Sequence, residues 1–363
     1  MKTAGFHHIT MVSSDAPRTL IFYRDLLGFD LVKITVNHDD PSAYHLYFGL
    51  DGGRPGTILT FFEWKHLPRG RFGVGGVHHV ALSVSDAEAQ LRWKRRLTDA
   101  GVRVTGPYDR GYFRSIYFSD PDGQILEIAT AGPGYAFDEP ADSLGTAVIT
   151  PDAHRLRGRR DEAAIADLTH GEPVPTVDAG MAITGVHHVS GITDDVERAH
   201  EFYEGGLGLS LVKKTVNQDD GETPHWFWAE YDGTNVAPGS SMTLFEWGAA
   251  GSPARPGSGQ THHIAFRAVD GEQQTALVER LAAAGVETTP EIDRVYFRSV
   301  YFQAPDGQLC EIATDGPGFA VDEPADSLGS RLVLPPWMES NREAIEASLT
   351  PLPLLVDTAE AVE

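Results

Sequence analysis

The sequence contains four pairs of adjacent histidines, each in a short apolar stretch typical of a strand. The pairs are His7-His8, His78-His79, His187-His188 and His262-His263. A single histidine on a strand is most often a hydrogen-bonded core residue. Recurrence at four equivalent positions instead favours a shared chemical role, and neutral imidazole is a common metal ligand. The histidine pairs are therefore the first candidates for metal binding.

Two glutamates could complete such a site. Glu127 lies in QILEIA and Glu311 in QLCEIA, so each is a charged residue inside an otherwise apolar strand. A buried carboxylate is costly unless it is paired or bound to a metal. Two imidazoles and one carboxylate form the facial triad of non-haem Fe(II), which leaves positions open for a substrate and O₂ and a net charge of about +1 that suits a phenolate. Cys310 should point away from Glu311 and serve as packing.

Both glutamates lie in a long stretch that the chain contains twice, at residues 109–145 and 293–329. Each copy carries an arginine, a tyrosine and the glutamate at the same internal positions, and each continues through GPG to DEPADSLG. The accompanying residues are Arg110 and Tyr117 in the first copy and Arg294 and Tyr301 in the second. A strand and a turn could explain one such run, but a polar pattern preserved in both copies predicts a shared site.

The repeat extends to the whole chain. GFHHIT at 5–10 returns as GVHHVS at 185–190, and LVKITVNHDD at 31–40 returns as LVKKTVNQDD at 211–220. We predict a first module pair over 1–145, a linker arm over 146–182, a second module pair over 183–330 and a C-terminal arm over 331–363. We expect both arms to wrap a neighbouring unit on the surface and not to form sites.

Each half holds two units that begin with a His-His strand, pass through a polar cap into a helix and end in two or three strands. In the first half we predict helices over 18–27 and 91–100 and strands over 44–49, 57–63, 115–119 and 124–129. Such a βαβββ unit leaves one sheet face uncovered. The predicted fold is therefore α+β, with four βαβββ modules that pair into two half-open barrels, each around a metal cavity.

The residue pattern leaves the pairing of the modules open. Pairing within a half would join His8 with His79 and Glu127, whereas pairing across the halves would join His8 with His263 and Glu311. Adjacent side chains in a regular strand point to opposite faces, so only one histidine of each pair should face a given cavity.

Composition narrows the class of protein. A chain of 363 residues with 41% apolar residues is long enough for two folded domains. A net charge of −23 and a pI near 4.9 oppose a nucleic-acid or anionic-membrane partner, and no apolar run approaches the roughly 18 residues of a membrane span. With one cysteine and no apolar signal core at its N-terminus, the protein is expected in the cytoplasm. Exposed sheet edges make a homodimer plausible.

These motifs resemble a known family. The HHIT opening, the LVKITVNHDD stretch followed by His45, and the run from DRVYFRSVYF through EIAT to DEP are similar to the vicinal oxygen chelate superfamily of glyoxalases, bleomycin resistance proteins and extradiol dioxygenases. More narrowly, they resemble its ring-cleaving dioxygenases of the hydroquinone type. The resemblance covers nearly the whole chain and favours pairing across the halves.

The resemblance also implies roles for particular residues. Iron would be held by His8, His263 and Glu311, with supporting or acid/base roles for His7 and His262 and substrate-oxygen contacts from Tyr301 and Arg294. The middle units of the family usually lack the metal motif, but this chain departs from that pattern. It retains a second set of ligands in His188, His79 and Glu127, accompanied by His187, His78, Tyr117 and Arg110. We therefore predict two complete sites.

The expected function is Fe(II)-dependent ring cleavage of a small hydroquinone or catechol-like aromatic by O₂, with Mn(II) or Zn(II) as substitute metals. The histidine beside each ligand could take the phenol proton, because the ordinary pKa of histidine lies near working pH. Four aromatic residues could line the ring pocket, although core packing explains them equally well: Phe113, Phe297, Trp226 and Trp228.

Two other functions use the same residues differently. A glyoxalase-like isomerase or lyase would add a fourth protein ligand, for which Glu63 or Glu246 would have to reach the metal, whereas we expect both to be exposed strand ends. A metal-free protein that binds an aromatic or an antibiotic would have no use for the complete triads.

Overall fold

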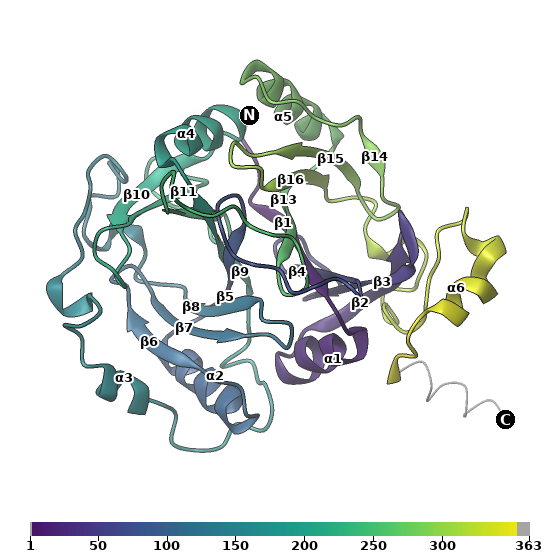
Figure 1. Ribbon diagram of the computed structural model, residues 1–363, viewed down its shortest axis with the longest axis horizontal. Helices are drawn as coiled ribbons and strands as arrows, with labels where there is room; N and C mark the ends of the chain where they lie inside the picture. The colour runs from purple at the N-terminus through teal and green to yellow at the C-terminus, as the bar shows by residue number, and fades with distance from the viewer. Residues whose placement is uncertain (1, 354–363) are drawn as a thin grey trace.

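The computed structural model describes residues 2–353 as two curled sheets of eight strands each, with helices at the outside (Figure 1). The first sheet has the order β14 (Ile292–Asp293), β15 (Arg298–Gln303), β16 (Leu309–Thr314), β13 (Thr261–Ala268), β1 (Phe6–Ser13), β4 (Ile58–Glu63), β3 (Asp40–Gly49) and β2 (Asp30–Asn37). The second has the order β10 (Ser210–Val216), β11 (Pro224–Ala229), β12 (Ser241–Glu246), β9 (Gly185–Thr193), β5 (Val77–Val84), β8 (Ile125–Thr130), β7 (Arg114–Ser119) and β6 (Thr105–Asp109). The predicted α+β fold of paired βαβββ modules is confirmed.

The modules pair across the halves of the chain. In the first sheet β1 of the first module runs antiparallel to β13 of the fourth, and in the second sheet β5 of the second module runs antiparallel to β9 of the third. Each sheet therefore draws half of its strands from each half of the sequence, which is the arrangement that the family resemblance favours.

Most of the α-helices begin at aspartates that cap their first turns. Asp15 accepts a hydrogen bond from the Arg18 amide at the start of α1 (Ala16–Leu20), and Asp86 does the same for Ala89 in α2 (Ala87–Asp99). The predicted helix over 18–27 is α-helical only in its first part, because residues Ile21–Leu26 form a π-helical turn. The remaining α-helices are α3 (Glu162–Asp167), α4 (Val196–His200), α5 (Gly271–Ala283) and α6 (Arg342–Ser348). Within residues 2–353 no helix is both long and apolar enough to cross a membrane.

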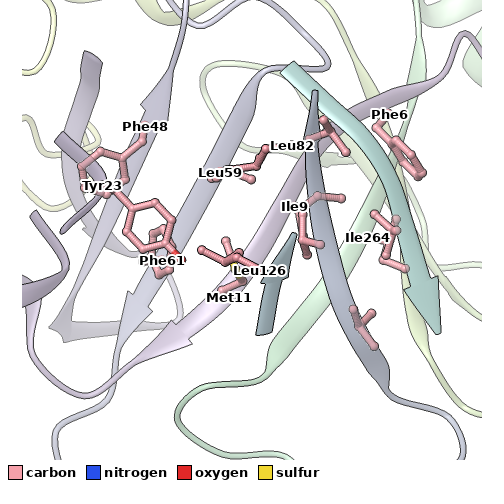
Figure 2. Packing of buried hydrophobic residues seen from close by; sticks show 14 of the residues in the cluster. Phe6, Ile9, Met11, Tyr23, Phe48, Leu59, Phe61, Leu82, Leu126 and Ile264 are labelled. Atoms are coloured by element: carbon pink, nitrogen blue, oxygen red, sulfur yellow. The ribbon is translucent and has the colours of Figure 1, made fainter. Parts of the chain in front are cut away.

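The largest hydrophobic core lies between the two sheets. Leu82 and Leu126 of the second sheet join the same cluster as Ile9 and Ile264 of the first (Figure 2). Ile9 directly follows one of the paired histidines in sequence and is fully buried. Packing of this shared core fixes the position of the His-His strands.

Two buried lysines connect the repeated motifs. Lys33 of the LVKITVN stretch is fully buried and pairs with Asp322, at 2.5 Å, and with Glu323 of the DEP motif from the other half. In the second sheet Lys213 pairs in the same way with Asp138 and Glu139. A buried ammonium group is tolerated only with such partners. The two motifs are therefore preserved as interacting pairs that hold each long repeated stretch against the other half.

Removing one of these lysines should strongly destabilise the protein. We expect Lys33→Ala to lower the free energy of unfolding by about 3–5 kcal/mol, because Glu323 would remain buried without its charge partner. Urea titration followed by circular dichroism measures the loss. Lys214→Ala, at a half-buried position on β10, should cost less than about 1 kcal/mol. Equal losses in the two variants would contradict this role for Lys33.

Candidate metal centres

The three ligands predicted for the first site meet inside the first sheet. Nε2 of His8 on β1 lies 3.2 Å from Nε2 of His263 on β13. Oε2 of Glu311 on β16 lies 3.0 Å from Nε2 of His263 and 3.5 Å from Nε2 of His8. All three side chains are buried. The cluster combines a residue of the first half with two of the second.

The second set of ligands has the same geometry in the second sheet. Nε2 of His79 on β5 lies 3.2 Å from Nε2 of His188 on β9 and 2.9 Å from Oε2 of Glu127 on β8. His188 is 3.5 Å from the same carboxylate oxygen. The six predicted ligands thus form two groups of three. Within residues 2–353, no other group of three or more His, Cys, Asp or Glu side chains is placed so that it could hold a metal ion.

The clusters fit a metal ion on chemical grounds. In each glutamate one oxygen accepts a hydrogen bond from a serine, Ser299 for Glu311 and Ser115 for Glu127, while Oε2 is buried without a hydrogen-bond partner. Burial alone would raise the pKa of Glu311, but His8 and His263 hold it well below its usual range. A charged oxygen and two imidazole nitrogens therefore converge where a divalent cation would satisfy all three.

The first histidine of each pair is the extra residue of a β-bulge. On β1, Phe6 pairs with Phe266 and His8 with Ala265, so that His7 has no opposite residue. Equivalent register shifts leave out His262, His78 and His187. A bulge changes the direction of a side chain in its strand. The strict alternation expected from sequence is therefore wrong at these positions, and both rings of a pair come close together.

Each bulged histidine holds the ring of the neighbouring ligand. Nδ1 of His7 lies 2.9 Å from Nδ1 of His8, and the corresponding distance is 2.8 Å in the other three pairs. For Nε2 of His8 to bind a metal, its Nδ1 must carry the proton and donate a hydrogen bond to Nδ1 of His7. Such a contact fixes the tautomer and orientation of the ligand ring.

Burial places the pKa of these neighbours below the range expected from sequence. Burial and the adjacent ligand histidine lower the pKa of His7, His78 and His187 to about 3, and that of His262 to about 4. The four rings are therefore neutral and can accept hydrogen bonds.

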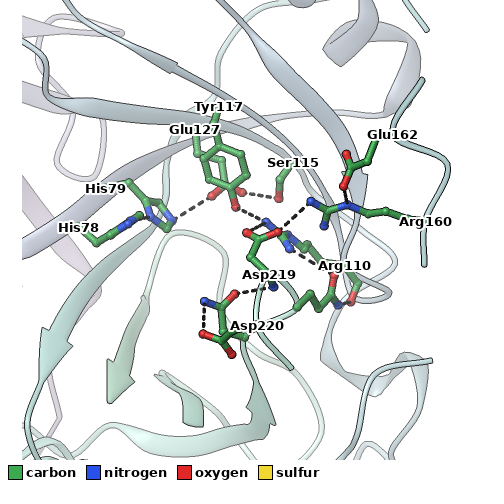
Figure 3. Close-up of polar contacts among 12 residues, drawn as sticks. His78, His79, Arg110, Ser115, Tyr117, Glu127, Arg160, Glu162, Asp219 and Asp220 are labelled. Atoms are coloured by element: carbon green, nitrogen blue, oxygen red, sulfur yellow. Dashed lines mark hydrogen bonds and ion pairs between the residues drawn. The ribbon is translucent and has the colours of Figure 1, made fainter. Parts of the chain in front are cut away.

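The predicted tyrosines and arginines stand beside the ligands. The ring of Tyr301 lies 5.7 Å from that of His263, and the Tyr301 hydroxyl accepts a hydrogen bond from Nε of Arg294 at 3.3 Å. In the second site Tyr117 lies 5.4 Å from His79 and its hydroxyl is 3.2 Å from Nη2 of Arg110 (Figure 3). The repeated stretches thus deliver all three of their polar residues to the two clusters.

The predicted aromatic residues divide into two groups. Phe297 lies 5.0 Å from His8, and Phe113 lies 5.2 Å from His188, so both flank the clusters. Trp226 and Trp228 instead belong to the hydrophobic core, where Trp228 packs 5.2 Å from Tyr203. Cys310 is also buried in that core, as predicted.

The two strand-end glutamates do not join the clusters. Glu63 is buried, not exposed as predicted, because its carboxylate accepts a hydrogen bond from the Ala16 amide at 2.8 Å, at the start of α1. Glu246 is half-buried and accepts from the Val196 amide of α4 at 2.9 Å. Helix N-termini favour such carboxylates. Both residues thus have structural roles away from the ligands.

A cavity of about 740 Å³ opens onto the second cluster, and it includes residues that sequence reasoning missed. His225 of β11 lines it and is held by Thr243 at 2.9 Å, as His45 of β3 is held by Thr60. The preserved spacing of His45 and His225 in the repeat was the available signal.

The linker arm also lines the cavity through Arg157 and Arg160, so the expectation that the arm forms no part of a site is wrong.

Comparison with known proteins places this geometry in context. The chain matches the model of the Glyoxalase/Bleomycin resistance protein/Dioxygenase superfamily over residues 5–128 and again over 185–312. MhqA of Bacillus subtilis (strain 168), provisionally named a ring-cleaving dioxygenase, is 31% identical over 97% of this chain and 100% of its own length. The chlorohydroquinone/hydroquinone 1,2-dioxygenase of Sphingobium indicum is 27% identical over 95% of each chain.

A solved structure extends the likeness to three dimensions. The crystal structure of a Bacillus subtilis protein, provisionally titled a dioxygenase, matches with a TM-score of 0.76 at 32% identity, over 97% of this chain and 98% of its own. The match to this solved structure therefore covers both pairs of modules.

Metal stoichiometry tests whether both clusters bind an ion. We expect the anaerobically loaded protein to hold two Fe(II) ions per chain, and Glu311→Ala and Glu127→Ala to hold one each, since each removes the only carboxylate of one cluster. Elemental analysis after desalting gives the count. Glu63→Gln serves as the control and should retain two ions. Loss of all metal in either alanine variant would refute independent sites.

Proposed function

The chain belongs to the Glyoxalase/Bleomycin resistance protein/Dioxygenase superfamily, and within it we propose that the protein is an Fe(II)-dependent ring-cleaving dioxygenase of a hydroquinone or catechol-like aromatic. The sequence matches to MhqA and to the hydroquinone dioxygenase support ring cleavage as the reaction. The substrate class follows the name of the second relative and the polar residues around the clusters.

The observation that carries the proposal is the ligand set. Each cluster contains two histidines and one glutamate within residues 2–353, and no fourth protein ligand joins them. This is the set that suits non-haem Fe(II) and leaves positions for both a substrate and O₂. A glyoxalase-like reaction would require Glu63 or Glu246 as a further ligand, and both cap helices instead. A metal-free binding protein would leave two buried carboxylate oxygens unpaired.

When bound at such a cluster, Fe(II) supplies adjacent open positions that bring an aromatic diol and O₂ together. His8, His263 and Glu311 would hold the ion at the first site, and His79, His188 and Glu127 at the second. His7, His262, His78 and His187 would orient the ligand rings through their Nδ1 contacts.

The tyrosine and the arginine would bind a substrate oxygen. Burial raises the pKa of Tyr301 above its ordinary value, so its hydroxyl keeps its proton. Because that hydroxyl already accepts from Arg294, its own O–H remains available to donate to the substrate. The positive charge of Arg294 stabilises negative charge that develops on the ring oxygen. Tyr117 and Arg110 have the same arrangement at the second site.

Proton removal from the diol falls to a neutral imidazole. His225 lines the second cavity, and burial lowers its pKa well below the usual value, so the ring is unprotonated. At the first site the pKa of His45 is lowered in the same way, but both of its ring nitrogens already have partners, because Nδ1 lies 2.9 Å from the Tyr47 hydroxyl and Nε2 lies 2.9 Å from the Thr60 hydroxyl. If Nε2 of His225 donates its hydrogen bond to Thr243, the lone pair of Nδ1 is the one that would accept the phenol proton.

Oxygen consumption tests the proposed reaction directly. Anaerobically purified protein loaded with Fe(II) should consume one O₂ per hydroquinone or catechol in an oxygen-electrode assay, with a ring-opened product detected by mass spectrometry. The protein loaded with Zn(II), which has no redox chemistry, provides the control and should consume none. Failure of the Fe(II) protein on a panel of hydroquinones and catechols would exclude the proposal.

The role of the tyrosine can be isolated by silencing one site. In a Glu127→Ala background, where activity belongs to the first site, Tyr301→Phe should lower kcat by about 100-fold, because a donor to the developing oxyanion is lost. Tyr117→Phe in the same background is the matched control and should have no further effect. Steady-state oxygen uptake gives both values, and equal rates for the two phenylalanine variants would contradict the assignment.

A further inference from the structure

The linker arm contributes arginines to the wall of the second cavity. Arg157 donates its backbone N–H to the carbonyl of Gln218 at 2.9 Å, which anchors the arm beside the turn between β10 and β11. Arg160, three residues further along the arm, lies at the cavity and points towards Asp219 and Arg110 (Figure 3). A segment that joins the two halves in sequence therefore contributes charge to the second site.

Arg160 is held in a fixed position in this wall. Its side chain is only 7% exposed, and its guanidinium lies 4.1 Å from the ring centre of Tyr108. Nε pairs with Glu162 at 2.7 Å and Nη2 with Asp219 at 2.8 Å. Nη1 is buried and has no hydrogen-bond partner within residues 2–353. A buried donor without a partner is costly, and an acceptor supplied by a ligand would remove that cost.

A second arginine increases the positive charge at the same place. Arg110 lies 3.7 Å from Asp219, so one carboxylate is shared between two guanidinium groups. The other partner of Arg160, Glu162, is 47% exposed, and solvent screens its charge. Arg110 and Arg160 therefore place two guanidinium groups at one carboxylate in the cavity wall.

Among residues 2–353, no arginine is placed in this way at the first site. Asp39, the counterpart of Asp219, pairs with Arg294 alone at 3.5 Å among the described residues, and its side chain is 80% exposed. Ile292 occupies the place of Tyr108 in the repeat. Arg342 at the start of α6 in the C-terminal arm pairs with Glu339 and Glu346 instead. The two sites thus share their ligands but differ in the charge around them.

We propose that the second site selects aromatic diols that carry a carboxylate on the ring, which Arg160 binds, whereas the first site takes uncharged rings. The part of this inference that concerns the diol rests on the proposed function. The part that concerns the carboxylate rests on Arg160 and its surroundings. One chain would then contain two sites of the same chemistry with different substrates.

Binding measurements separate this inference from the reaction itself. In a Glu311→Ala background loaded with Fe(II), we would measure Kd under anaerobic conditions by calorimetry for 2,5-dihydroxybenzoate and for its methyl ester. The acid and the ester differ in charge at the carboxyl group, so the ratio of their Kd values reports its recognition. We expect the acid to bind about tenfold or more tightly than the ester, and Arg160→Gln to abolish that preference.

The matched control is Arg159→Gln, which removes the same charge from an exposed position on the same arm and should leave the ratio unchanged. Preference for the acid that persists in Arg160→Gln, or that is absent from the parent protein, would overturn the inference even if the protein cleaves diols. Arg160-dependent binding of the acid without any oxygen uptake would instead support the carboxylate site and refute the proposed reaction. Circular dichroism of Arg160→Gln confirms that the arm variant is folded.

Discussion

The pairing of β1 with β13 and of β5 with β9 is the interaction on which the rest of the structure depends. Each of these antiparallel contacts joins a His-His strand of one half to a His-His strand of the other, so that two imidazoles lie 3.2 Å apart across it. The glutamate strand then pairs parallel to one of them and completes the cluster. Neither half of the chain can form a cluster by itself in this arrangement. Both clusters therefore require the two halves to pair.

The β-bulges determine how the histidines are oriented in these two strand pairs. A regular strand would direct the two histidines of a pair to opposite faces, and the ligand ring would then be free to rotate. The extra residue in each strand brings the second imidazole to Nδ1 of the ligand, which leaves Nε2 directed at the glutamate. The same local distortion occurs four times, once in each module. The bulges therefore account for the histidine pairs better than two independent roles would.

The duplicated parts of the molecule include buried ion pairs, and the parts that differ include the charged residues around the second cavity. Lys33 with Glu323 and Lys213 with Glu139 are buried at equivalent places and bind each long repeated stretch to the opposite half. The linker arm and the C-terminal arm, in contrast, carry arginines with different partners. The linker arm brings Arg160 to the second cavity, whereas the arginine that begins α6 interacts within its own arm. Duplication has thus preserved the ligands and left the surroundings of each site free to differ.

The sequence by itself determined the repeated βαβββ units, the four histidine pairs, the two glutamates and the tyrosine and arginine beside them, because these follow from periodicity, turn residues and a polar pattern that occurs twice. The family resemblance identified the second histidine of each pair as the ligand. Tertiary structure alone decided three other matters. It paired the modules across the halves, because strand partners far apart in sequence are chosen by core packing that no local pattern encodes. It placed both histidines of a pair in contact, because a bulge depends on the register of two strands. It turned Glu63 to a helix N-terminus and Arg160 into a cavity wall, because the partners of these groups come from distant segments.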